Sequence, residues 1–135
     1  MKRFRVFRDI FKFRSIKTSF SFAIKGIVYL FLFHRNMRII FLLGIAVFLL
    51  GVYFKLKSFE FMILCLTVSI VFLAEMFNTA IELVIDMFID KYHTLVKIIK
   101  DISAGVVLIA SINALIIAYF LFFHRILNLI KELGG

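Results

Sequence analysis

Three long apolar stretches constrain the fold of this chain more than any other feature of its sequence. They cover residues 39–54, 61–74 and 102–123. Each approaches the ~20 apolar residues that a helix needs to cross about 30 Å of hydrocarbon. A chain of 135 residues that is 64% hydrophobic has too little interior to bury this surface in water. We therefore expect an integral membrane protein with membrane helices at about residues 37–56, 59–88 and 100–124.

The expected class is all-α. The chain has no proline and only six glycines, two of them at the C-terminus, so long uninterrupted helices are favoured. The ten-residue alternating segments of a membrane β-barrel are missing from the sequence. At this length the chain is predicted to form a single membrane domain, residues 1–135. The one cysteine, Cys65, lies in an apolar run and is expected to serve packing.

The N-terminal 34 residues form the expected amphipathic surface segment. Residues 1–17 hold seven basic residues, and Phe4, Phe7 and Phe11 recur at helical spacing. This pattern predicts a helix lying in the membrane interface, with a disordered basic tail as the alternative. The apolar stretch 20–33 contains Lys25 and is short, which favours an interfacial position, although a fourth span remains an alternative.

The distribution of basic residues predicts the orientation. Ten of the 17 lysines and arginines precede the first span, and Lys91, Lys97 and Lys100 lie between the second and third. The positive-inside rule then places the N-terminus and the 75–101 connection in the cytoplasm, and the C-terminus outside. The net charge of +9 is explained by an anionic membrane surface rather than by nucleic acid.

The third span carries features of a helix–helix interface. Ala110, Ala114 and Ala118 repeat every four residues, a spacing of small residues that lets helices approach closely in lipid. Asn113 should face protein, because an amide facing acyl chains is unfavourable. Three spans make a thin bundle, so homo-oligomerisation would help to bury these groups.

The second span runs into a stripe of polar residues on one helical face. On a helix these side chains project within about 100° of one another, and they are Glu75, Asn78, Thr79, Glu82 and Asp86. Clustered carboxylates near lipid persist when a cation, a proton or a basic partner neutralises them. Mg²⁺ suits such oxygen ligands, and lysines downstream attract anions, which suggests phosphate chemistry on a lipid. The alternative is a solvated stripe whose Glu82 and Asp86 form salt bridges with Lys97 and Lys100.

Several familiar catalytic motifs are absent from the sequence. Neither a P-loop nor a G-x-G-x-x-G motif occurs, so a nucleotide site would not belong to those classes. The lone cysteine and the three widely spaced histidines give no zinc signature. A G-x-S-x-G nucleophile elbow is also missing. These absences exclude most common enzyme classes.

The polar stripe and the segment after it resemble the prokaryotic diacylglycerol kinase / undecaprenol kinase family. The pattern E-x-x-N-[ST]-A-I-E-x-x-x-D fits residues 75–86, and H-x6-K-D fits residues 93–101. The basic N-terminal helix and the three spans also match, so the resemblance covers nearly the whole chain. It implies a homotrimer with sites shared between subunits. Residues 34–36 and 78–82 look closer to the undecaprenol kinase branch than to the enterobacterial diacylglycerol kinase.

The resemblance also implies a role for each residue of the pattern. Glu75 matches the general base that takes the proton from the lipid hydroxyl, and Glu82 matches a carboxylate that holds Mg²⁺ on ATP. Lys100 matches the lysine that binds the phosphates. The other implied nucleotide contacts and the supporting polar wall are Asp101, Tyr92, His93, Asp86 and Asn78.

One position departs from the family pattern. The family usually carries Glu-Arg-Asn before the first span, and that glutamate is a second metal ligand, whereas this chain has His34-Arg35-Asn36. Imidazole is a poor Mg²⁺ ligand and suits softer metals such as Mn²⁺. This departure leaves three interpretations, which are weaker Mg²⁺ binding, a changed metal preference and a lost activity.

The resemblance therefore implies an ATP-dependent lipid kinase of the bacterial inner membrane. Its expected substrate is undecaprenol or diacylglycerol, phosphorylated at the cytoplasmic face with Mg²⁺, or with Mn²⁺ given His34. The alternative is a catalytically impaired homologue that acts as a non-enzymatic membrane protein.

Overall fold

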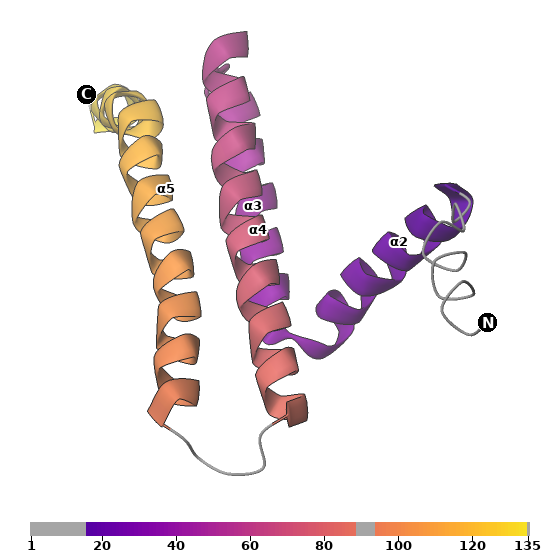
Figure 1. The fold of residues 1–135 in the computed structure, drawn as a ribbon. Coiled ribbons are helices and arrows are strands. Elements are labelled where there is room, and N and C mark those ends of the chain that lie inside the picture. The colour runs from indigo at the N-terminus through magenta and orange to yellow at the C-terminus, as the bar shows by residue number, and fades with distance from the viewer. Residues whose placement is uncertain (1–15, 89–93, 135) are drawn as a thin grey trace, which may run out of the picture. The chain divides into compact units, whose positions relative to one another are not determined.

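The computed structural model describes residues 16–88 and 94–134 of the chain. Within these residues the chain is helical apart from short connections (Figure 1), and its elements are α2 (Ile16–Phe33), α3 (Arg35–Tyr53), α4 (Ser58–Phe88) and α5 (Thr94–Gly134). All four are long and apolar enough to cross a membrane. The all-α class is confirmed, and the described residues hold one more candidate span than the three expected. The chain divides into two compact units, Met1–His34 and Arg35–Gly135, each described by itself.

The helix α2 covers the apolar stretch whose placement was open. Its 18 residues meet the length and hydropathy of a span. The charge of Lys25 is partly accommodated within α2, because its Nζ lies 5.7 Å from the centre of the Phe22 ring. Beyond Phe33, the His34 N–H donates to the Leu30 carbonyl at 2.9 Å. The length and hydropathy of α2 fit both an interfacial and a spanning position. Residues 1–15 of the predicted amphipathic segment 1–34 lie outside the described residues.

Close packing of α3 on α4 depends on two buried glycines. A Cβ added at Gly44 would lie 3.1 Å from Val68 Cγ1. One added at Gly51 would lie 3.1–3.2 Å from carbons of Leu56, Leu64 and Phe61. Gly44 and Gly51 are seven residues apart, which places them on one face of α3. The missing side chains allow the two helices to approach closely, as small residues do in membrane bundles.

A tight turn ends α3 and begins α4. The Leu56 N–H donates to the Gly51 carbonyl and the Lys55 N–H to the Val52 carbonyl, each at 3.0 Å, which is a Schellman motif. Lys55 has φ of 49°, the left-handed conformation that this motif usually assigns to glycine. The first helix end therefore comes at Tyr53, a few residues before the expected residue 56. The backbone N–H of Lys57 then donates to Glu60 Oε2 at 2.8 Å and caps α4.

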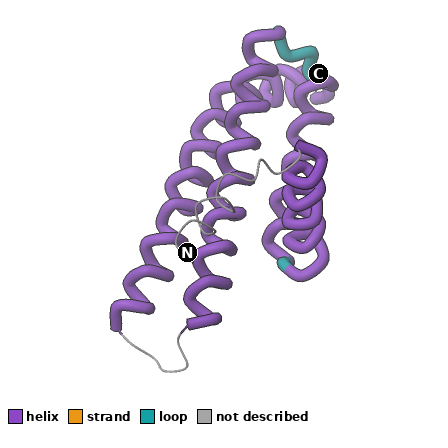
Figure 2. The backbone as a smooth tube through the Cα atoms, turned by 45° about the vertical axis from the view of Figure 1, so that its right-hand side comes forward, coloured by secondary structure: helices purple, strands orange, loops and turns teal. Residues whose placement is uncertain are grey.

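The helices α4 and α5 lie side by side in both views of the backbone (Figure 1, Figure 2). Near one end they enclose an apolar cluster of Leu64, Leu121 and Phe122, against which Ala118 packs. Ala110 is buried, and Ala114 lines an apolar groove of about 340 Å³ between α3, α4 and α5. The small residues predicted to permit close helix contact do so within the chain. Asn113 is exposed, so the protein contact predicted for it is not made within Arg35–Gly135.

The helix α5 extends beyond the predicted third span. The span was expected to end near residue 124, but the helix continues to Gly134 and contains 41 residues. In Figure 1 the orange part of α5 runs beside α4, whereas its yellow C-terminal turns point along the line of sight. The helix is therefore continuous but bent near its C-terminal third. The absence of proline, and of glycine between residues 106 and 133, explains why the helix does not stop.

Candidate functional site

The polar stripe lies on one uninterrupted helix, as predicted. The helix α4 continues through all five stripe residues and ends at Phe88. Three of them are buried, with exposed fractions of 4% for Glu75, 8% for Asn78 and 2% for Thr79. Glu82 is half-buried and Asp86 is exposed. The stripe thus passes from a buried end at Glu75 to an exposed end at Asp86, over about three helical turns.

A hydrogen-bonded chain joins the stripe to α5. Ser103 Oγ donates to Asn78 Oδ1 at 2.7 Å, and Asn78 Nδ2 donates to Glu82 Oε1 at 3.1 Å. Ser103 Oγ also lies 2.9 Å from the Lys100 carbonyl. A serine has a single hydroxyl proton, so the two acceptors share one donor. The amide of Asn78 therefore fixes one oxygen of Glu82 and is itself fixed by the neighbouring helix.

Lys100 forms an ion pair with the exposed end of the stripe. Its Nζ lies 2.7 Å from Asp86 Oδ1, with side chains 40% and 64% exposed. An ion pair this exposed contributes little to stability, because water screens it. If the stripe were only solvated, Glu82 and Asp86 were expected to form salt bridges with Lys97 and Lys100. Asp86 does pair with Lys100, whereas Glu82 accepts a hydrogen bond from Asn78. Asn78, Glu82, Asp86, Lys100 and Ser103 together are called the α4–α5 polar cluster below.

Glu75 occupies the buried end of the stripe, one turn before Asn78 and Thr79. Among the described residues, no hydrogen bond reaches its carboxylate. A carboxylate can act as a general base for a hydroxyl that comes within hydrogen-bond distance.

The carboxylates of the site suit a metal that is shared with a phosphate rather than a metal held by protein alone. Within residues 16–88 and 94–134 there is no group of three His, Cys, Asp or Glu side chains able to hold a metal ion. Glu82 Oε1 accepts the Asn78 bond, but Oε2 accepts none from the described part of the chain. Mg²⁺ commonly uses one or two carboxylates and fills its shell with water and substrate phosphates. The donor set of Glu82 fits that arrangement.

The other predicted site residues lie elsewhere on α5, outside the described residues, or in the N-terminal unit. Asp101 follows Lys100 on α5 and is exposed. Tyr92 and His93 fall outside the described residues. His34 belongs to the N-terminal unit, so its role as a metal ligand stays a prediction.

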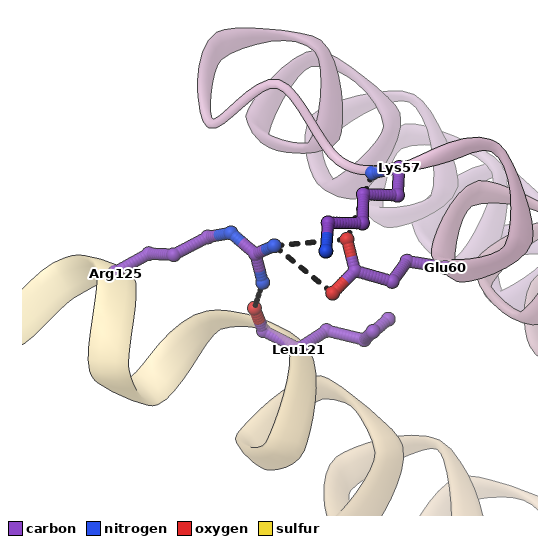
Figure 3. Close-up of polar contacts among 4 residues, drawn as sticks. All are labelled: Lys57, Glu60, Leu121 and Arg125. Atoms are coloured by element: carbon purple, nitrogen blue, oxygen red, sulfur yellow. Dashed lines mark hydrogen bonds and ion pairs between the residues drawn. The ribbon is translucent and has the colours of Figure 1, made fainter.

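Ser103 and an ion pair at the other end of α4 were not singled out from the sequence. Ser103 lies three residues after Lys100, a spacing that puts both on one helical face and offered the signal. Arg125 Nη2 lies 2.9 Å and 2.8 Å from the two carboxylate oxygens of Glu60 (Figure 3). Glu60 begins the second span and Arg125 ends the third, so antiparallel helices bring them together.

The sequence of the chain is similar to a family of known proteins. The model of the family described as "Prokaryotic diacylglycerol kinase" matches residues 21–122. A diacylglycerol kinase of Synechocystis is 37% identical over 116 residues, or 85% of this chain and 66% of that protein. An undecaprenol kinase of Bacillus subtilis is 33% identical over 108 residues, or 80% of this chain and 88% of that protein. The matched region spans just under two thirds of the first relative. The chain belongs to the prokaryotic diacylglycerol kinase family of membrane lipid kinases.

Proposed function

We propose that this protein transfers the γ-phosphoryl group of ATP to the hydroxyl of a membrane lipid alcohol. The substrate is undecaprenol or diacylglycerol, the lipids for which the two relatives are named. The observation that carries the proposal is the Ser103–Asn78–Glu82 hydrogen-bonded chain, next to the buried carboxylate of Glu75. It places a fixed carboxylate and a buried one on the same face of a membrane helix.

In the proposed reaction, Glu75 accepts the proton of the lipid hydroxyl while the hydroxyl oxygen attacks the γ-phosphorus. The bond to the β-phosphate oxygen breaks, and ADP leaves. The position of Glu75 on α4 supports this role, because α4 is long and apolar enough to cross a membrane and the lipid hydroxyl would come from the bilayer. Phosphoryl transfer depends mainly on positioning and charge neutralisation, so few protein groups are needed.

The nucleotide is proposed to bind at the exposed end of the stripe. Glu82 would hold Mg²⁺, which when bound neutralises charge on the phosphates. Lys100 would exchange its exposed partner Asp86 for a phosphate oxygen. Asp101, Tyr92 and His93 are proposed as further nucleotide contacts, and His34 as a metal ligand that favours Mn²⁺.

The proposed assembly is a homotrimer in the inner membrane of a bacterium, with the N-terminus and the site on the cytoplasmic side. Exposure of Asn113 on the single chain supports contact with another copy. The excess of basic residues before α3 supports the orientation.

Two glutamate variants and one matched control test the site. We expect Glu75→Gln and Glu82→Gln to abolish transfer of ³²P from ATP to lipid in detergent micelles. Glu132→Gln removes an exposed carboxylate far along α5 and should leave the rate unchanged. A Glu75→Gln variant with the parent's rate would refute the assignment of the general base. A Glu82→Gln variant with an unchanged Mg²⁺ requirement would refute the assignment of the metal ligand.

A further inference from the structure

The last part of α5 separates apolar and polar side chains more cleanly than the spanning part does. From residue 122 onward, the apolar side chains project within about 160° of one another; they are Phe122, Phe123, Ile126, Leu127, Leu129, Ile130 and Leu133. The polar ones occupy about 120° on the opposite side; they are His124, Arg125, Asn128, Lys131 and Glu132. This is the pattern of a helix that lies between an apolar and an aqueous phase.

The helix α5 is too long to lie entirely within the hydrocarbon core, so its C-terminal part must lie in different surroundings from its spanning part. Its 41 residues would extend about 62 Å as a straight helix, twice the ~30 Å of a hydrocarbon core. The bend separates a part that runs beside α4 from a part that turns away (Figure 1). The C-terminal turns therefore do not continue the direction of the span.

Polar contacts join α5 to α4 at the start of its C-terminal turns. Arg125 Nη1 donates to the Leu121 carbonyl one turn earlier, and Arg125 Nη2 binds Glu60 on α4 (Figure 3). Glu60 lies 15 residues before Glu75, or about 22 Å along α4. The bend is thus at the end of the bundle opposite the α4–α5 polar cluster.

Beyond Phe122, which is buried in the cluster with Leu64 and Leu121, most of the apolar side of the C-terminal turns is exposed within the unit. Ile130 is 59% exposed and Leu133 is 80% exposed. Phe120, Phe123, Leu127 and Ile130 are exposed and follow one another at intervals of three or four residues. The apolar strip is therefore continuous with the exposed surface of the span, which faces lipid. A bilayer is the surrounding that accounts for both parts of this strip.

We propose that residues 123–134 form a second membrane-surface element, at the face of the bilayer opposite the α4–α5 polar cluster. Its apolar side lies in the boundary of headgroups and acyl chains, and its polar side faces water. Lys131 lies on the polar side, where its ammonium group can meet lipid phosphates. Together with the Glu60–Arg125 pair, this element fixes the depth of α5 in the membrane.

Single tryptophans test this placement, because the chain contains no tryptophan. Ile130→Trp marks the centre of the apolar side, and Asn128→Trp marks the centre of the polar side. Each full-length variant is reconstituted in phosphatidylcholine–phosphatidylglycerol vesicles, in which part of the phosphatidylcholine is brominated near the top of the acyl chains. We expect the brominated lipid to quench Ile130→Trp at least about twofold more than Asn128→Trp, and aqueous iodide to show the reverse order.

Lipid phosphorylation by both variants serves as the check that they are folded. If either variant does not fold, Ile126→Trp and Lys131→Trp replace the pair on the same two sides. Equal quenching of the two positions would overturn the proposal. Blue-shifted emission from the apolar position without quenching by brominated lipid would also overturn it, since that result indicates a protein contact.

Discussion

The hydroxyl of Ser103 offers a sharp test of the site, because it is the contact by which α5 fixes the α4 stripe. It is 3% exposed and donates to Asn78 at 2.7 Å. Its removal in Ser103→Ala leaves Asn78 Oδ1 without this donor and releases the amide that holds Glu82. We therefore expect a loss in rate through the position of Glu82 rather than through a lost catalytic group.

The magnitude follows from measured hydrogen bonds between membrane helices. These contribute about 0.6 kcal/mol on average and up to about 1.7 kcal/mol. If the whole loss appears in the transition state, at 1.36 kcal/mol per tenfold change, kcat/KM falls about 3- to 18-fold. A loss of 100-fold or more would mean that Ser103 acts directly on the substrate.

The assay measures kcat and the KM for ATP with a lipid alcohol in mixed micelles, at several Mg²⁺ concentrations. Because Ser103 acts through Glu82, high Mg²⁺ should partly restore the rate of Ser103→Ala. Ser111→Ala is the matched control, since Ser111 is a half-buried serine on the same helix that lines an apolar groove. The reasoning is refuted if Ser103→Ala keeps the parent's rate, or if Ser111→Ala loses as much.

Three further predictions concern stability and metal preference. Lys55→Gly should stabilise the protein by about 1 kcal/mol, because Lys55 adopts a left-handed conformation; an unchanged or lower melting temperature in detergent would contradict this. Gly51→Ala should destabilise by about 1–3 kcal/mol through crowding at 3.1–3.2 Å, whereas Gly105→Ala, with open space around its Cβ, should not; equal melting temperatures would refute the packing argument. His34→Glu should raise the ratio of the Mg²⁺-supported to the Mn²⁺-supported rate, since carboxylate oxygen suits Mg²⁺ better than imidazole does; a constant ratio would exclude His34 from the metal site.

The long helices and the polar stripe could be predicted from the sequence because each depends on local pattern. The apolar runs and the lack of proline predict long helices. The intervals between Glu75, Asn78 and Glu82 place these three side chains on one face of a helix. The hydrogen bond from the Lys57 N–H to Glu60 that caps the start of α4 is likewise a local feature.

Contacts between helices were not predictable in the same way. Ser103 reads as one polar interruption in an apolar span until α5 is packed on α4 and its hydroxyl meets Asn78. Arg125 and Glu60 read as flanking charges until the antiparallel pair brings their side chains together. The length of α5 was underestimated because the apolar window ends near residue 123, although the amphipathic pattern continues to Leu133.

The most direct test of the central claim is phosphoryl transfer by the purified protein. Undecaprenol and diacylglycerol are each supplied in detergent with γ-³²P-labelled ATP, and the organic extract is analysed for labelled lipid phosphate. We predict Mg²⁺- or Mn²⁺-dependent labelling of at least one of the two lipids, and its loss in Glu75→Gln. Absence of labelled lipid with both alcohols and both metals, from a protein that is folded and reconstituted, would contradict the account.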